Sequence, residues 1–149
     1  MDTKMGPKKI LIVDDDPDVR LGLHVRLVAN GYETAFAGDA LTALAEARKQ
    51  QPDLIILDLG LPAGDGFVVM ERIGRLPSLS VIPIIVVSAR DVRANQERAI
   101  KAGAKAFLQK PVDNNELLAV IRRALGEPAA ESSEPHTGTW PIVDATPRP

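Results

Sequence analysis

The sequence predicts an α/β fold, a doubly wound parallel sheet of five strands with helices on both faces. Two observations predict it. Short apolar runs alternate five times with segments of helical periodicity. The strongest runs are apolar throughout rather than at every second position, as expected for strands that helices cover on both sides. Right-handed crossover connections then place the strands in one sheet.

The first two strand–helix pairs come from the N-terminal third of the chain. Ile10–Val13 is the first strand, and Asp16–Pro17 starts a helix, because aspartate caps helices and proline suits their first turn. Asn30–Gly31 ends this helix. A short strand at residues 33–36 precedes a second helix capped by Asp39. The apolar faces of the two helices are Val19, Leu23 and Leu27, and Ala40, Leu44 and Ala47.

The third and fourth strand–helix pairs contain strands that are apolar at every position. Leu54–Leu57 leads into a loop rich in glycine and proline at residues 60–66, and a helix is expected at 67–75. Ile84–Val87 is the fourth strand. The fourth helix is expected at residues 91–103, opened by an aspartate and ended by a glycine.

The fifth pair is a short strand at residues 106–108 followed by a helix. Asp113 and Glu116 have the spacing of a capping box at its start. The apolar stripe of this helix consists of Leu117, Leu118, Ile121 and Leu125.

Composition restricts the classes of function. The chain has 149 residues, 45% of them hydrophobic, and a formal net charge of -2, which gives no general attraction to nucleic acid or to an anionic membrane. It contains no cysteine, which excludes disulfides and cysteine nucleophiles. Neither a signal peptide nor a membrane-spanning run is evident, so we expect a soluble, cytoplasmic protein.

The chain divides into three parts. Residues 1–7 are expected to be a flexible N-terminus, 8–126 the folded domain, and 127–149 a disordered tail rich in proline, alanine and serine. The tail has one apolar patch, Trp140–Val143, which is either unstructured or a docking motif for the domain itself or for a partner.

Five polar residues follow strand ends: Asp14, Asp15, Asp58, Ser88 and Lys110. In a doubly wound sheet the carboxyl ends of the strands share one rim, where the working site lies. Adjacent aspartates are often only a turn or a cap, but here they follow apolar strands. Three crowded carboxylates repel one another, and a divalent cation, Mg²⁺ or Mn²⁺, would relieve that repulsion.

The rim has the chemistry of phosphoryl transfer. Asp58 can act as a nucleophile, Lys110 adds a positive charge opposite it, and the Gly60 carbonyl is placed to be a metal ligand. Ser88 has no histidine paired with it, which argues against a Ser–His–Asp site. The Lys110–Pro111 bond is a candidate cis peptide, although the low frequency of cis X–Pro bonds gives this conformation no support from the sequence alone.

These residues resemble a known family. The segments IVDDDP (12–17), DLGLPAGDG (58–66), SA (88–89) and KP (110–111) are similar to those of the receiver domains of bacterial two-component response regulators. The resemblance covers residues 8–126. It implies a flavodoxin-like (βα)5 fold with strand order 2-1-3-4-5, like that of single-domain chemotaxis regulators.

The resemblance also implies roles. Asp58 is the phosphoacceptor, Asp15 binds Mg²⁺ directly, and Asp14 acts largely through water. Ser88 and Lys110 contact the phosphoryl group.

The resemblance to receiver domains also implies which residues respond to phosphorylation. Phe107 occupies the family's aromatic switch position, where a side chain without a hydroxyl can change only its packing. The family's output surface corresponds to residues 91–125.

The hypothesis is therefore a phosphoacceptor signalling protein, not an enzyme, that assists its own phosphorylation and dephosphorylation. Its phosphodonor would be a sensor histidine kinase or a histidine phosphotransfer protein. It would bind an unknown downstream protein or pass the phosphoryl group onward, as a monomer or a phosphorylation-dependent dimer.

Three alternatives share parts of this pattern. A degenerate receiver would fold alike without being phosphorylated, but no site residue is missing. A flavodoxin-like cofactor binder would need flavin-stacking aromatics, and aromatics are 3% of the chain. A haloacid-dehalogenase-type phosphatase would use Asp14 and Asp16 as its Asp-x-Asp pair, but the chain leaves little room for a cap domain.

Overall fold

The computed structural model describes residues 6–62 and 65–128. Within them, five parallel strands form one sheet in the order β2-β1-β3-β4-β5. The strands are β1 (Lys9–Val13), β2 (Glu33–Ala37), β3 (Leu54–Leu57), β4 (Ile84–Ser88) and β5 (Ala104–Gln109). The helices are α1 (Pro17–Ala29), α2 (Ala40–Gln50), α3 (Gly66–Gly74), α4 (Val92–Lys101) and α5 (Asn114–Ala124). In the described part of the chain, every helix is too short or too polar to cross a membrane.

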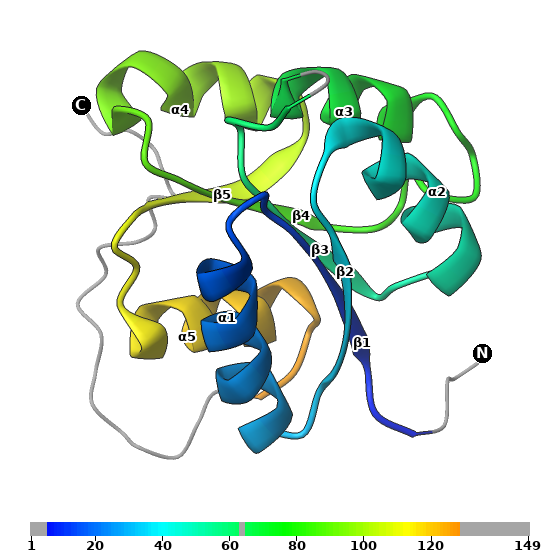
Figure 1. The fold of residues 1–149 in the computed structure, drawn as a ribbon, viewed down its shortest axis with the longest axis vertical. Coiled ribbons are helices and arrows are strands. Elements are labelled where there is room, and N and C mark those ends of the chain that lie inside the picture. Colours follow the sequence, from blue (N-terminus) through cyan, green and yellow to red (C-terminus); the bar gives the residue numbers. More distant parts are fainter. Residues whose placement is uncertain (1–5, 63–64, 129–149) are drawn as a thin grey trace.

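Helices cover both faces of the sheet (Figure 1). α1 and α5 lie on one face, and α2, α3 and α4 lie on the other. Leu54 and Ile56 of β3 pack with α1 and α5, whereas Ile55 and Leu57 pack with the other three helices. All four residues are at most 2% exposed. Burial on both faces explains why this strand is apolar at every position.

Aspartates begin the helices. Asp16, Asp39 and Asp91, which the sequence predicts as caps, each accept a backbone N–H from the first turn of their helix. Asp65 does the same for α3, which therefore begins at Gly66, one residue before the predicted start. Of the capping box predicted for α5, the hydrogen bond from the helix to the Asp113 side chain does not form. Asp113 is the N-cap residue, but its side chain makes no capping hydrogen bond within the described residues.

Tyr32 ties the end of α1 to the segment after α5. Its hydroxyl donates a hydrogen bond of 2.8 Å to the Glu127 carboxylate. Its backbone N–H donates to the Leu27 carbonyl at 3.1 Å. Burial and the hydrogen bond to Glu127 raise the pKa of Tyr32 to about 12, because both disfavour the phenolate.

We expect the tyrosine of the native protein to titrate near pH 12 rather than near its ordinary pKa of 10.0. Because the folded-state pKa lies above the unfolded value, the stability that this group contributes is complete below about pH 10 and is lost as the pH rises through the folded-state pKa. Tyr32 is the only tyrosine, so phenolate absorbance reports it alone. Glu127→Gln should titrate at lower pH. An unshifted wild-type midpoint would contradict the contact.

Candidate functional site

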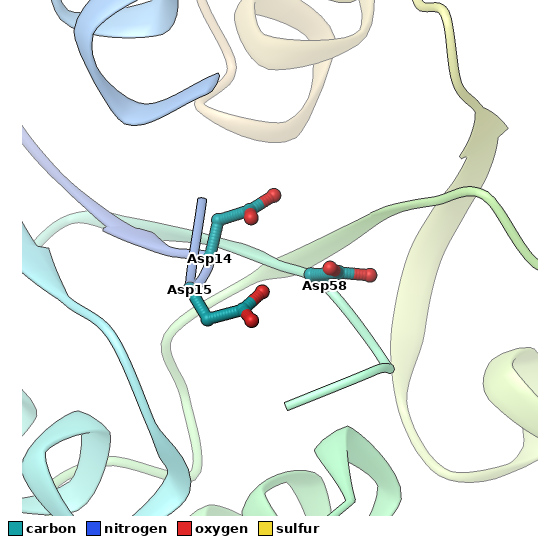
Figure 2. Close-up of side chains that lie close together, drawn as sticks. All are labelled: Asp14, Asp15 and Asp58. Carbon is teal, nitrogen blue, oxygen red and sulfur yellow. The ribbon is translucent and has the colours of Figure 1, made fainter. Parts of the chain in front are cut away.

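Three carboxylates meet at the carboxyl ends of β1 and β3 (Figure 2). The two strands pair in parallel with Val13 opposite Leu57, so Asp14 and Asp58 follow at neighbouring strand ends. The Asp58 backbone N–H donates to the Val13 carbonyl at 2.9 Å. One carboxylate oxygen from each of Asp14, Asp15 and Asp58 lies within 4.8 Å of the others. The structure thus brings together the three acidic residues that the sequence singles out.

The three carboxylates differ in exposure. Asp14 is 3% exposed and Asp58 is 7% exposed, whereas Asp15 is on the surface. Oδ1 of Asp14 accepts the Asp16 backbone N–H at 3.0 Å, and Oδ1 of Asp58 accepts the Gly60 backbone N–H at 3.2 Å. The site is therefore anchored in the sheet on one side and open to solvent on the side of Asp15.

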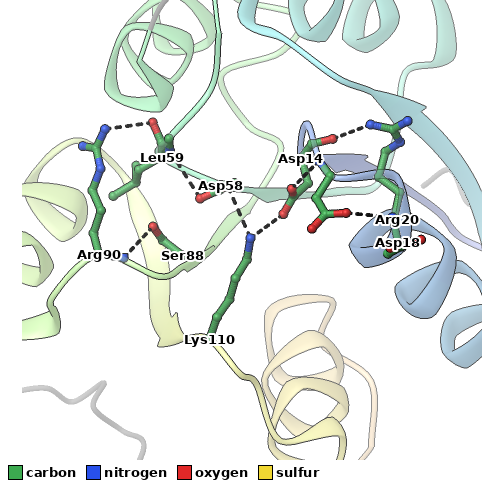
Figure 3. Close-up of polar contacts among 10 residues, drawn as sticks. Asp14, Asp18, Arg20, Asp58, Leu59, Ser88, Arg90 and Lys110 are labelled. Carbon is green, nitrogen blue, oxygen red and sulfur yellow. Dashed lines mark hydrogen bonds and ion pairs between the residues drawn. The ribbon is translucent and has the colours of Figure 1, made fainter.

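Lys110 reaches into this cluster from the end of β5 (Figure 3). Its Nζ lies 2.7 Å from Oδ2 of Asp14 and 3.3 Å from Oδ2 of Asp58. Its backbone N–H donates to the Ser88 carbonyl at 2.9 Å, which joins the ends of β4 and β5. The Lys110–Pro111 peptide bond, a candidate that the sequence does not decide, is cis.

The Lys110 ammonium stays charged in these surroundings. Burial by itself lowers its pKa, but the hydrogen bond to Asp14 and the charges of Asp58 and Asp14 outweigh burial, so the pKa is raised. The Lys110 ammonium contacts two of the three carboxylates of the cluster, Asp14 and Asp58, so negative charge is left in excess. A donor set made of carboxylate oxygens at this spacing fits a hard divalent cation such as Mg²⁺ or Mn²⁺.

Ser88 ends β4 and is 1% exposed. Since β3 lies between β1 and β4 in the sheet, Ser88 and Asp14 flank Asp58 from opposite sides (Figure 3). The Ser88 Oγ accepts a hydrogen bond from the Arg90 backbone N–H at 3.2 Å. With its oxygen accepting this bond, the hydroxyl keeps its own proton for another acceptor.

Phe107 lies on β5 opposite Val86 of β4. It is 3% exposed and belongs to the core between the sheet and α2, α3 and α4. The ring at the predicted switch position is therefore packed inside the domain, and β4 separates its strand from β3.

Two arginines near the site are not predicted by the sequence pattern. Arg20 of α1 donates from Nη1 to the Asp14 carbonyl at 2.7 Å. Arg90 donates to the Leu59 carbonyl and to Oδ2 of Asp65, each at 3.3 Å (Figure 3). Arg20 holds the backbone of the first acidic residue, and Arg90 ties the loop after β4 to the loop after β3. Every residue carries a backbone carbonyl, so an arginine that binds one has no pattern in the sequence that reveals it.

Comparison with known proteins decides the family. Residues 10–122 match the family model of the response regulator receiver domain. The chain belongs to this family. It is 40% identical over 115 residues to the response regulator PleD of Caulobacter vibrioides, covering 76% of the chain and 25% of PleD. It is 40% identical over 124 residues to the KDP operon transcriptional regulatory protein KdpE of Escherichia coli, covering 83% of the chain and 54% of KdpE.

The chain thus spans about half or less of these two relatives. Solved structures match it over nearly their whole length. A CheY-like receiver domain protein from Methanospirillum hungatei is 30% identical, with a TM-score of 0.76 and coverage of 81% of this chain and 95% of that one. These neighbours confirm the predicted flavodoxin-like receiver fold.

A second solved structure bears on the acidic cluster. The receiver domain of a sensor histidine kinase from Pseudomonas aeruginosa is 28% identical, with a TM-score of 0.75 and coverage of 82% of this chain and 100% of that one. That domain holds a magnesium ion coordinated in its active-site cleft.

Proposed function

We propose that this receiver domain is a phosphorylation-dependent signalling switch in which Asp58 accepts the phosphoryl group. The position of the Asp58 carboxylate carries the proposal. It lies at the end of β3, beside Asp14 and Asp15, and 3.3 Å from the Lys110 ammonium. An aspartate carboxylate can attack phosphorus and form an aspartyl phosphate. An adjacent ammonium can attract the oxygens of the incoming phosphoryl group.

The donor in this proposal is a phosphohistidine on a sensor histidine kinase or a histidine phosphotransfer protein. An oxygen of Asp58 forms a bond to phosphorus while the bond between phosphorus and the donor's imidazole nitrogen breaks. The electron pair of the broken bond stays with the imidazole, and the product is an aspartyl phosphate. Because such transition states are loose, positioning and charge neutralisation supply the catalysis.

Lys110 and Ser88 supply the neutralising contacts. The Lys110 ammonium already lies between Asp14 and Asp58 and can turn toward a phosphoryl oxygen. The Ser88 hydroxyl can donate its proton to another phosphoryl oxygen while Arg90 holds its Oγ. The domain would in this way assist its own phosphorylation and its hydrolytic dephosphorylation.

The residues present fit a divalent metal ion. Asp15, Asp58 and the Gly60 carbonyl would hold Mg²⁺ or Mn²⁺, and Asp14 would act largely through water. When bound, the ion supplies positive charge to the phosphoryl oxygens. The exposure of Asp15 leaves room for the water ligands that Mg²⁺ keeps, and the magnesium ion of the Pseudomonas receiver domain supports the choice of metal.

The readout in this proposal is a change on the surface of α4, β5 and α5. Movement of Ser88 toward the phosphoryl group would leave space beside β4, and Phe107 on the neighbouring strand would repack into it. A downstream protein would read the new surface, as would a second copy if phosphorylation drives dimerisation. We assign the switch to residues 8–126 and to the cytoplasm.

The position of Asp16 disfavours the phosphatase alternative. Its side chain caps α1 by accepting the Asp18 backbone N–H at 2.9 Å, and it is exposed. The Asp14-x-Asp16 pair therefore lacks the second inward carboxylate that a haloacid-dehalogenase-type reaction needs.

Incubation with acetyl phosphate and Mg²⁺ should add one phosphoryl group to the protein, as an acid-stable, base-labile adduct seen by intact mass spectrometry. The adduct should fall to background in Asp58→Asn, because an amide oxygen is a poor nucleophile. It should persist in Asp113→Asn, the matched control, whose side chain lies outside the acidic cluster. An adduct that survives in Asp58→Asn, or no adduct on the wild-type protein, would contradict the assignment.

A further inference from the structure

Hydrogen bonds surround the peptide group between Asp14 and Asp15. Oδ1 of Asp14 accepts the Asp16 backbone N–H at 3.0 Å. The Asp16 carbonyl accepts the Arg20 backbone N–H at 3.1 Å. Nη1 of Arg20 then donates to the Asp14 carbonyl at 2.7 Å (Figure 3). These contacts close a ring through the start of α1, and the ring spans Asp15.

The position of the Asp15 carboxylate depends on this backbone. Asp15 is exposed, and its carboxylate forms no hydrogen bond or ion pair with another described residue. Asp14 and Asp58, in contrast, are buried and both contact Lys110. Yet an oxygen of Asp15 lies within 4.8 Å of an oxygen of each of them. Since no side-chain contact holds Asp15 in the cluster, the direction in which its backbone presents the carboxylate decides its place there.

Arg20 acts on the backbone of the acidic cluster rather than on its charge. Within the described residues, the Arg20 guanidinium forms no ion pair with a carboxylate of the cluster, whereas Lys110 pairs with two of them. The Arg20 guanidinium instead binds the Asp14 carbonyl, and a hydrogen bond from a charged donor is stronger than one between neutral groups. The cluster therefore keeps its excess negative charge for another cation, while its backbone is held.

The end of β2 holds the other side of this arrangement. A Cβ built on Gly38, the residue after β2, would lie 3.2 Å from Nη1 of Arg20. The guanidinium thus lies against the backbone there. The Asp14 backbone N–H donates to the Ala37 carbonyl of β2 at 3.1 Å. Both polar groups of the Asp14 backbone are therefore fixed, the N–H by β2 and the carbonyl by Arg20.

We propose that Arg20 is a positioning residue of the divalent-metal site, because it holds the peptide group that directs the Asp15 carboxylate toward that of Asp58. The inference rests on the function proposed above, in which these two carboxylates bind Mg²⁺ or Mn²⁺. Groups that orient metal ligands without touching the metal contribute about 10- to 100-fold to metal affinity. Without Arg20 the peptide group can rotate, and the Asp15 carboxylate spends time away from the position that the metal needs.

Removal of Arg20 separates positioning from charge, because the two effects have opposite signs. Arg20→Met deletes a positive charge near the cluster, so electrostatics alone would strengthen the binding of a divalent cation. Loss of the positioning contact should instead weaken it by about tenfold. A Mn²⁺ titration at constant ionic strength, followed by the loss of the electron paramagnetic resonance signal of free Mn²⁺, measures the dissociation constant. Arg26→Met is the matched control, since Arg26 is exposed in the last turn of α1, and it should bind Mn²⁺ as the wild type does.

The metal dependence of phosphorylation gives a second readout. Arg20→Met should need about tenfold more Mg²⁺ than the wild type to reach half of its maximal rate of acetyl phosphate labelling. At saturating Mg²⁺ its rate should approach that of the wild type. A residue that only stabilised α1 would lower the urea midpoint and leave the metal dependence unchanged.

Two outcomes separate this inference from the proposed function. If Arg20→Met binds Mn²⁺ as tightly as the wild type, or more tightly, the inference is overturned and the proposed function stands. A wild-type protein that binds no Mn²⁺ would overturn the metal site of the proposed function and the inference with it. Circular dichroism checks that Arg20→Met is folded. If it is not, Arg20→Lys replaces it: the shorter side chain should still weaken Mn²⁺ binding, and affinity equal to that of the wild type would overturn the inference.

Discussion

Replacing Lys110 by methionine is expected to destabilise the metal-free domain by about 2–3 kcal/mol at neutral pH. The ammonium lies 2.7 Å from Asp14 and 3.3 Å from Asp58, two aspartates whose side chains are at most 9% exposed. Methionine keeps most of the side-chain volume but leaves both carboxylates without their cation. Loss of one partner from a buried pair costs more than the pair itself contributes. Urea unfolding monitored by circular dichroism, in buffer free of divalent ions, measures the difference.

Two further measurements identify the cause of that loss. Mg²⁺ should stabilise Lys110→Met more than the wild-type protein, because the variant has more negative charge to neutralise. Lys105→Met is the matched control, since Lys105 lies exposed on the same strand, and it should stay within about 0.5 kcal/mol of the wild type. Equal stability of Lys110→Met and Lys105→Met would show that the ion pair does not support the fold.

The sequence predicts the sheet because the signal for a buried parallel strand is local. Ile10–Val13 and Leu54–Leu57 are apolar at every position, and the structure buries both faces of each. The carboxyl ends of parallel strands lie along one rim of the sheet, so the strand order alone brings Asp14 and Asp58 together. The sequence therefore groups Lys110 with Asp14 and Asp58, although these residues are 96 and 52 positions away from it.

The contacts that the sequence does not predict depend on side-chain conformation. The sequence predicts Lys110 opposite Asp58, yet its shorter contact is with Asp14. Asp113 has the residue type and spacing of a helix cap, but its side chain does not turn back onto the first turn. Arg20 and Arg90 bind carbonyl oxygens, which every residue carries. Such choices follow from packing between segments far apart in the chain, not from local pattern.

Gly66→Ala is expected to destabilise the domain by about 2–3 kcal/mol and to slow phosphoryl transfer to Asp58. A Cβ at this position would lie 2.6 Å from the Asp58 carbonyl oxygen and 2.7 Å from the Leu59 Cα. Both are backbone atoms, so either α3 or the end of β3 must move. A shift of about 1 Å at a reacting group can cost on the order of 10²-fold in rate. Urea unfolding and the initial rate of acetyl phosphate labelling measure the two effects.

Gly74→Ala provides the matched control at the other end of the same helix. No described atom outside the local helix lies within 4 Å of a Cβ built at Gly74, and its φ is not in the left-handed region. Alanine should therefore stabilise α3 there by up to about 1 kcal/mol, because glycine loses more backbone entropy on folding. Labelling of Asp58 should be unchanged. If Gly66→Ala matched Gly74→Ala in both measurements, the close approach of α3 to the backbone of Asp58 would have no part in placing the phosphoacceptor.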